Sequence, residues 1–261
     1  MLPDYASLQA LVAQFPPITL EEMSKIRLMN RTDTKFVTTL PVLERLLALC
    51  QGSYYAQVNC GHVIAPYRTV YWDDDLHTMY QRHQCGARPR IKVRARTYVD
   101  SALSFLEIKR KDNHGKTRKK RVAVPSIEAV VQEAAGEDFL RERTDFCFTS
   151  ADDGRTLLRP RLQNRFQRIT LVNKAHTERL TIDFGLCFNN FDSGQEHALP
   201  RTVIIELKRE GRQPSPILPL LRQLRVKPAG FSKYCIGTAL TNPDVRLNLF
   251  KERLALLRHC L

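Results

Sequence analysis

Four cations stand at every second position of one short segment. Residues 90–96 read Arg-Ile-Lys-Val-Arg-Ala-Arg. In an extended strand successive side chains point to opposite faces, so this segment has one cationic face and one apolar face. Solvent-exposed faces usually mix charges, and four like charges on one face repel each other unless an anion lies among them. The segment therefore predicts a strand that packs with one face and binds an anion with the other.

The same alternation recurs in four further segments. In residues 105–111 the polar Glu107, Lys109 and Lys111 stand on the face opposite Leu106 and Ile108, and in residues 203–209 Glu206 and Lys208 stand on the face opposite Val203, Ile205 and Leu207. Residues 160–169 and 31–36 continue the pattern. A sheet that closes around these polar faces, with helices over its apolar outer faces, forms a basic tunnel. The polar positions are Arg31, Asp33, Lys35, Glu107, Lys109, Lys111, Arg161, Gln163, Arg165, Gln167, Glu206 and Lys208.

The order of breakers and apolar runs predicts an α+β fold. Two short helices are expected in residues 1–28, the second opened by the Thr19 and Glu22 capping box, and further helices in 39–50, 126–135 and 243–259. We expect one tunnel domain over residues 1–261, with 1–28 as an N-terminal helical brace and 242–261 as a C-terminal helix. Turn residues between the strands favour an antiparallel meander that forms a β-barrel tunnel with flanking helices. The expected strands are 31–38, 67–73, 90–99, 104–111, 117–124, 160–172, 178–188, 202–209 and 233–240.

Charge and cysteine content narrow the class of protein. The 41 Lys and Arg against 27 Asp and Glu give a net charge of +14, which favours a polyanionic partner: nucleic acid, an anionic membrane or polyphosphate. The seven cysteines are scattered and form no CxxC pair, so neither a disulfide framework nor a zinc site is indicated. No stretch approaches the ~20 apolar residues of a membrane helix. We expect a soluble protein of the reducing cytoplasm.

Two carboxylates interrupt the cationic rows. Glu107 and Glu206 stand on faces that otherwise carry Lys. A carboxylate next to a phosphate would repel it, but a divalent cation between them removes the conflict, because Mg²⁺ and Mn²⁺ take one or two protein carboxylates and complete their shells with phosphate oxygens and water. We therefore expect Glu206 or Glu107 to bind Mn²⁺ or Mg²⁺, and the Arg and Lys residues to bind phosphate.

Short motifs in a fixed order carry a family resemblance from about Asn30 to Leu240. They are Arg31-Thr-Asp-Thr-Lys35, Tyr71-Trp-Asp73, the strand Arg90 to Tyr98, Glu107-Ile-Lys109, Lys116 to Arg121, Asn164-Arg165-Phe166, Thr181-Ile-Asp183, Ile205-Glu206-Leu-Lys208 and Phe231-Ser-Lys233-Tyr234. In this order they resemble the VTC-type polyphosphate polymerase domain, a branch of the triphosphate tunnel metalloenzyme (CYTH-like) superfamily. Trp72 and Gln163 depart from that pattern.

The resemblance implies transfer of the γ-phosphate of ATP onto a growing polyphosphate chain inside an antiparallel tunnel, with release of ADP. It implies that Glu206 binds the metal and that Lys233 lies near the transferred phosphate, with Arg94 and Arg96 as further catalytic residues. Lys120 is taken as the inward-facing residue of the group 119–121. The phosphate contacts implied by matching motif positions are Lys35, Arg94, Arg96, Lys109, Arg165 and Lys233.

Two other functions stay open. The same metal-containing tunnel could give triphosphate or polyphosphate to water, and a nonenzymatic module could bind polyanions through its charge alone. The cationic strands lack interleaved aromatics, so no specific nucleic acid is expected. Gly115-Lys116-Thr117 is not a P-loop, because Arg110 occupies the place of its first glycine and the segment joins two strands. ATP with polyphosphate or triphosphate is the expected ligand set; the oligomeric state and a membrane partner protein stay open.

Overall fold

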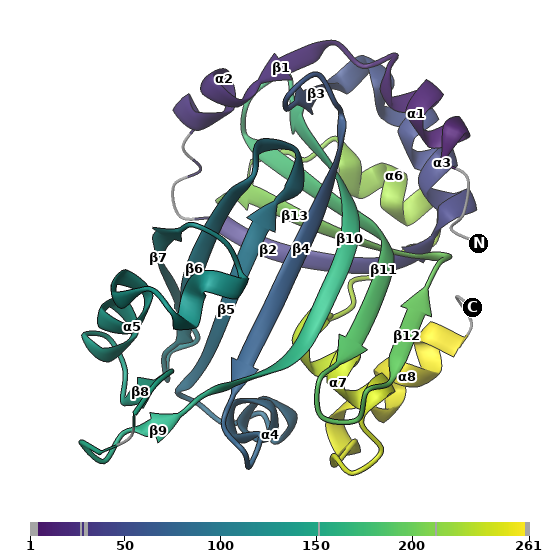
Figure 1. Ribbon diagram of the computed structural model, residues 1–261. Helices are drawn as coiled ribbons and strands as arrows, with labels where there is room; N and C mark the ends of the chain where they lie inside the picture. The colour runs from purple at the N-terminus through teal and green to yellow at the C-terminus, as the bar shows by residue number, and fades with distance from the viewer. Residues whose placement is uncertain (1–4, 27, 29–30, 151, 212, 259–261) are drawn as a thin grey trace.

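A curled antiparallel sheet is the main feature of the computed structural model, which describes residues 5–26, 28, 31–150, 152–211 and 213–258 (Figure 1). Its main strands are β2 (Arg31–Thr39), β4 (Ile64–Asp73), β5 (Arg90–Tyr98), β6 (Leu103–Lys111), β7 (Thr117–Val124), β10 (Arg159–Asn173), β11 (Glu178–Asn190) and β13 (Thr202–Glu210). They lie in the order β2-β13-β11-β10-β4-β5-β6-β7, and every neighbouring pair is antiparallel. In Figure 1 β2 and β13 cross behind β4 to β6, so the sheet curls over one of its own faces.

Shorter strands and helices surround this sheet. Short strands are β1 (Pro17–Thr19), β3 (Tyr54–Val58), β12 (Glu196–Leu199) and the separate pair β8 (Phe146–Cys147) and β9 (Thr156–Leu157). The α-helices are α1 (Ala6–Val12), α2 (Leu20–Lys25), α3 (Leu40–Cys50), α4 (Thr78–Gln84), α5 (Ala134–Arg141), α6 (Ile217–Gln223), α7 (Lys233–Thr241) and α8 (Lys251–Arg258). In the part of the chain that the structure describes, no helix has the length and hydropathy to cross a membrane.

Helices cover the apolar outer faces of the sheet. Ile205 of β13 lies in one buried cluster with Leu47 of α3 and Leu221 of α6. Val93 of β5 lies in a second cluster with Leu140 of α5. Burial of these aliphatic side chains, worth roughly 1.5–3 kcal/mol each, favours the arrangement that turns their polar neighbours to the inside of the curl.

The structure confirms the α+β fold and several expected elements. The sheet curls as the alternation predicts, but it stays open, since the described β2 and β7 do not pair with each other. The Thr19 side chain accepts from the Glu22 N–H and the Glu22 carboxylate accepts from the Thr19 N–H, which is the expected capping box. Pro41 lies in the first turn of α3, where its missing N–H costs nothing.

The strand expected at residues 233–240 is wrong, because this segment forms helix α7. Ser232 caps the helix by accepting a hydrogen bond from the Cys235 N–H at 3.3 Å. Gly237 lets the helix lie directly on β10 and β11, since an added Cβ would come within 2.6 Å of the side chains of Phe188 and Leu162. Capping and close packing here override the strand propensity of the aromatic and β-branched residues.

Three other expectations need correction. The helix expected at 126–135 is a 3-10 turn, Glu128–Val131, followed by α5, and Gly136 lies inside α5 instead of ending it. The C-terminal helix begins at Lys251 after a 3-10 turn, not near Pro243, and its expected end at His259 lies outside the described residues. Only β4 to β7 form a simple meander, because β10, β11 and β13 insert between β4 and β2.

Candidate active site

The predicted cations of β5 and β6 share the inner face of the curl. The strand register places Lys92 opposite Lys109 and Arg94 opposite Glu107. On the next strand Lys119 stands opposite Lys109. Because directly paired residues lie on the same side of a sheet, these side chains form one continuous polar surface across three strands.

The far side of the curl adds Lys35 and Glu206, which stand opposite each other on β2 and β13. Lys35 is also close to the β6 side of the curl. Desolvation, followed by the charges of Lys35 and Arg94, lowers the pKa of Lys109 to about 8. Residues from the two ends of the strand order therefore face a common interior. We call it the polar interior; it is bordered by Lys35 and Glu206 on one side and by Lys92, Arg94, Glu107 and Lys109 on the other.

Glu107 is the central anion of the β5 to β7 side. Its carboxylate is 1% exposed, accepts from Arg94 at 2.7 Å and accepts from Lys119 at 2.8 Å. Burial by itself would raise the pKa of Glu107, but Arg94, Arg96 and Lys119 outweigh it and hold the pKa well below its usual range. Each carboxylate oxygen of Glu107 already bonds to a cation, so Glu107 holds Arg94 and Lys119 in place.

Asp183 of β11 anchors a second pair of cations, which come from two other elements. Arg168 of β10 donates two hydrogen bonds to its carboxylate, at 2.5 and 2.8 Å. Lys233, at the start of α7, donates to the same carboxylate, which is 5% exposed. The Lys233 ammonium also lies 4.3 Å from the centre of the Phe166 ring, a cation–π contact. Lys233 thus points into the polar interior, although it stands on a helix and not on a strand.

The first turn of α7 is held by lysines of the sheet. Lys92 of β5 donates to the Ser232 hydroxyl at 2.7 Å, and Lys35 of β2 donates to the Phe231 carbonyl at 2.9 Å. These bonds tie the helix start to both sides of the curl. They fix the point from which Lys233 reaches toward Asp183.

Two lysines of the polar interior have depressed pKa values. Burial lowers the pKa of Lys233 to about 7, against the attraction of Asp183 and with added repulsion from Arg168. Burial also lowers the pKa of Lys92 to about 8, with Lys35 and Arg90 adding repulsion. An anion that enters this interior would stabilise the charged form of both lysines.

Glu206 is the more accessible of the two carboxylates expected to bind a divalent metal ion. It is 21% exposed and its partners are loose, with Lys208 at 3.2 Å and the Thr181 hydroxyl at 3.5 Å. Within the described ranges no group of three or more His, Cys, Asp or Glu side chains is placed to hold a metal ion. Mg²⁺ or Mn²⁺ bound with phosphates needs only one or two protein carboxylates, so Glu206 with substrate oxygens and water is a sufficient set.

The comparison with protein-family models shows to which family the chain belongs. A model of the VTC domain matches residues 30–242, which is most of the sequence. The chain belongs to the VTC domain family. This assignment confirms the resemblance and supports an enzyme that acts on phosphate compounds. A search of curated proteins gave no match to this VTC domain.

Solved structures with similar folds have low sequence identity to this VTC domain. A putative adenylate cyclase from Bacillus halodurans is 12% identical, with a TM-score of 0.47, over 85% of this chain and 100% of that chain. A putative adenylyl cyclase from Hippeastrum, described as having a dominant triphosphatase activity, is 14% identical, with a TM-score of 0.43, over 81% of this chain and 97% of that chain.

Two of the expected phosphate ligands lie outside the polar interior of this VTC domain. Arg165 is exposed and pairs in register with Arg68 on the opposite face of the sheet from Phe166. Lys120 stands opposite Ile108, which shares its face with the buried Val93 and not with Lys109. Both expectations are corrected by the register, because strand alternation fixes which residues share a face but not which face turns inward. The remaining expected ligands Lys35, Arg94, Arg96, Lys109 and Lys233 all border the polar interior; the side chain of Arg31 lies outside the description.

Other residues of the polar interior were not among the expected ligands. Arg168 shares a face with Phe166 and takes the place that Arg165 was expected to fill. Asp183 lies in the Thr181-Ile-Asp183 motif, yet its partners come from β10 and α7. Of the three alternatives, Lys119 and Arg121 both share the face of Glu107 and Lys109, and Lys119 donates to Glu107. The spacing of two residues between Phe166 and Arg168 already showed in the sequence that they share a face of the strand. The polar row of Gln163 and Arg165 nevertheless led to the prediction that the other face turns inward.

Asp73, from the Tyr71-Trp-Asp73 motif, joins this site to the rest of the VTC domain. The buried carboxylate accepts the N–H groups of Met79 and Tyr80 at the start of α4, each at 2.9 Å. It also accepts from the Tyr234 hydroxyl of α7 at 2.6 Å. Burial raises the pKa of Asp73, against these hydrogen bonds. This motif therefore positions α7 and the neighbouring Lys233.

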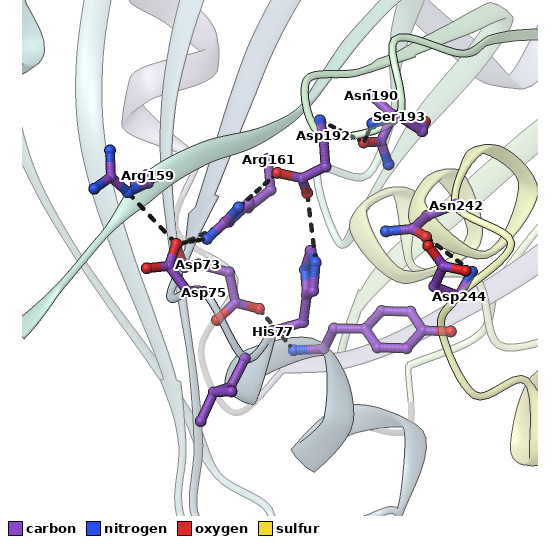
Figure 2. A network of polar contacts seen from close by, with 12 residues as sticks. Asp73, Asp75, His77, Arg159, Arg161, Asn190, Asp192, Ser193, Asn242 and Asp244 are labelled. Carbon is purple, nitrogen blue, oxygen red and sulfur yellow. Dashed lines mark hydrogen bonds and ion pairs between the residues drawn. The ribbon is translucent and has the colours of Figure 1, made fainter.

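A polar network braces the same end of the sheet, as Figure 2 shows. Arg161 bridges Asp75, in the loop after β4, and Asp192, in the turn after β11, with the latter at 2.5 Å. His77 reaches Asp192 at 3.4 Å. Arg161 was expected on the inward polar row, but it holds two loops together outside the polar interior.

Proposed function

We propose that this protein is a polyphosphate polymerase, which transfers the γ-phosphate of ATP onto a polyphosphate chain. The observation that carries the proposal is the length of the cation row on β5. At ~3.3 Å per residue the row from Arg90 to Arg96 spans about 20 Å, which is longer than the three phosphates of one nucleotide. A hydrolase of triphosphate needs to hold three phosphates, whereas a polymerase must hold the donor triphosphate and the acceptor chain end to end.

The transfer itself needs alignment and charge neutralisation more than covalent help. An oxygen of the terminal acceptor phosphate forms a bond to the γ-phosphorus. The bond from that phosphorus to the β–γ bridging oxygen breaks, and ADP leaves with the electron pair. Arg94, Arg96 and Lys233 are proposed to neutralise the oxygens around the γ-phosphorus, and Lys35 and Lys109 to bind the flanking phosphates.

Glu206 is proposed as the protein ligand of Mn²⁺ or Mg²⁺. When bound, the ion would neutralise phosphate charge next to Glu206. Asp183 would keep Arg168 and Lys233 oriented, because a buried carboxylate holds both in one place. The cations outnumber the anions in this interior, so phosphate charge is needed to balance it.

The deciding experiment incubates the purified protein with ATP and Mn²⁺ or Mg²⁺. Products are resolved on a gel, and ADP and free phosphate are measured separately. We expect long phosphate chains with an equivalent amount of ADP. Free phosphate without chains would instead identify a hydrolase, and binding of ATP without turnover would identify a polyanion-binding module.

A further inference from the structure

The two ends of the β5 to β6 side of the polar interior differ in chemistry. At one end β5 and β6 carry Arg90 and Lys111, which stand opposite each other. At the other end they carry Tyr98 and Phe105, on the same face as Arg96. A chain of phosphates has no group that suits an aromatic surface, so these rings act on phosphate only through the arginines that lie against them, and their accessible parts are left for a ligand of another kind.

We propose that the accessible rings of this aromatic end, Tyr98 and Phe105, bind the base of the nucleotide, with the buried Tyr67 behind them, and that the phosphates run from these rings toward Arg90. The inference rests on the proposed function in taking ATP as the donor. It adds a base-binding surface and the direction in which ATP lies along β5, since the γ-phosphate must lie between the base and the acceptor chain.

The aromatic side chains form a connected ladder. The ring of Tyr98 lies 5.0 Å from that of Tyr67 and 5.9 Å from that of Phe105, and both contacts are edge-on. Tyr67 in turn stacks on Phe166 at 5.2 Å. Phe166 is buried beneath the Lys233 ammonium, so the ladder leads from the proposed transfer site outward to the end of the strand.

The outer part of the ladder is accessible and has cations beside it. Tyr98 and Phe105 are half-buried, and the Arg121 guanidinium lies 4.4 Å from the centre of the Phe105 ring. Beyond them Val99 and Leu103 are 49% and 52% exposed, which gives the strand ends an apolar rim. Aromatic rings and arginine planes are the groups on which proteins stack nucleobases.

If the ladder served only to stabilise the fold, we would expect all of its rings to be buried. Tyr67 and Phe166 are almost fully buried and already complete the core contact. Tyr98 and Phe105 gain less from burial, and they stand where the sheet presents its cations to the polar interior. A partner with a flat ring and attached phosphates would cover the rings and reach Arg96 at the same time.

The test compares two ligands that differ in the nucleoside. Binding of ATP and of inorganic tripolyphosphate is measured by calorimetry at one Mg²⁺ concentration, on the intact chain and on Phe105→Leu and Tyr98→Leu. We expect ATP to bind about tenfold more weakly to each variant, because one stacking surface is lost, while tripolyphosphate affinity changes less than about twofold. Phe105→Tyr, which keeps a ring, should restore ATP affinity.

Phe191→Leu is the matched control, since Phe191 is 48% exposed in the turn after β11 and away from the ladder. It should bind both ligands as the unmodified protein does. Equal loss of both ligands in the ladder variants, or no loss of either, would overturn the base-binding surface. Selective loss of ATP binding in a protein that makes no polyphosphate would uphold the surface and reject only the polymerase.

Discussion

The hydroxyl of Tyr234 donates a 2.6 Å hydrogen bond to the carboxylate of Asp73 and so joins α7 to the end of β4. Both groups are buried, and Asp73 also accepts the N–H groups that start α4. Because Tyr234 directly follows Lys233, this bond fixes the helix turn from which the lysine enters the polar interior. The contact links a motif of the fold to the proposed chemistry.

Tyr234→Phe should therefore lower kcat more than it changes the KM for ATP. Loss of the hydroxyl leaves a buried carboxylate with one partner fewer, so we expect the free energy of unfolding to fall by about 1–3 kcal/mol. We expect kcat to fall about tenfold, because a small displacement of a catalytic group is costly. Tyr80→Phe is the control: its hydroxyl donates to the Arg246 carbonyl at 2.8 Å, away from Lys233. That variant should lose stability and keep kcat.

Lys233→Ala should lower kcat by about 10²-fold, the scale of losing one electrostatic stabiliser, with a much smaller change in ATP affinity. Thermal unfolding must be measured alongside, because Asp183 keeps Arg168 but loses one of its two cations. An unchanged kcat in a folded variant would remove Lys233 from the mechanism and leave it as a structural partner of Asp183.

The pH profile should show a basic limb from Lys233. Its pKa is about 7, so the free enzyme loses the ammonium as the pH rises through that value. We expect kcat/KM, which reports the free enzyme, to fall above pH about 7, and the limb of kcat to lie higher, because bound phosphate favours the charged lysine. Lys233→Arg should remove the limb, since arginine stays charged. A limb that persists in this variant would belong to another group, such as Lys92.

The same substitution in two carboxylates separates metal binding from structure. Glu206→Gln should raise the Mn²⁺ or Mg²⁺ concentration needed for activity by about tenfold or more, and leave stability nearly unchanged. Glu107→Gln should lower stability by about 3–5 kcal/mol, because Arg94 and Lys119 lose a buried counter-charge. Its metal requirement should stay as it was. If Glu206→Gln keeps its ordinary metal requirement, Glu206 is not the ligand.

Two arginines of β10 test which face turns inward. Arg168→Gln should weaken polyphosphate binding by roughly tenfold or more, because the polar interior loses a cation and Asp183 loses the arginine that neutralises it. Arg165→Gln, from the exposed outer face, should change binding by less than about twofold, apart from the general effect of net charge. Binding at two salt concentrations separates that general effect from the specific one. The reverse order of the two variants would contradict the register.

Local sequence determined the main strands of the sheet and the composition of their faces. Arg90 to Arg96 alternate with aliphatic residues, and this alone fixes a cationic face on β5, since the pleat has a period of two. Thr19 and Glu22 lie three residues apart, so the start of α2 was determined by its own capping groups. The motifs were sufficient to identify the VTC domain family, because they recur in order along most of the chain.

Only the tertiary structure decided which strand faces turn inward and that residues 233–241 form a helix instead of a strand. On β10 both faces carry polar groups, so Arg165 and Arg168 are distinguishable only once the curl of the sheet places Phe166 beneath Lys233. On β7 the register with β6 places Lys119 on the face of Glu107 and Lys120 on the face of Ile108. Residues 233–241 become a helix because Ser232 caps them and Gly237 fits against β10 and β11. Strand alternation is a local property, whereas the inward face is set by burial over segments distant in sequence.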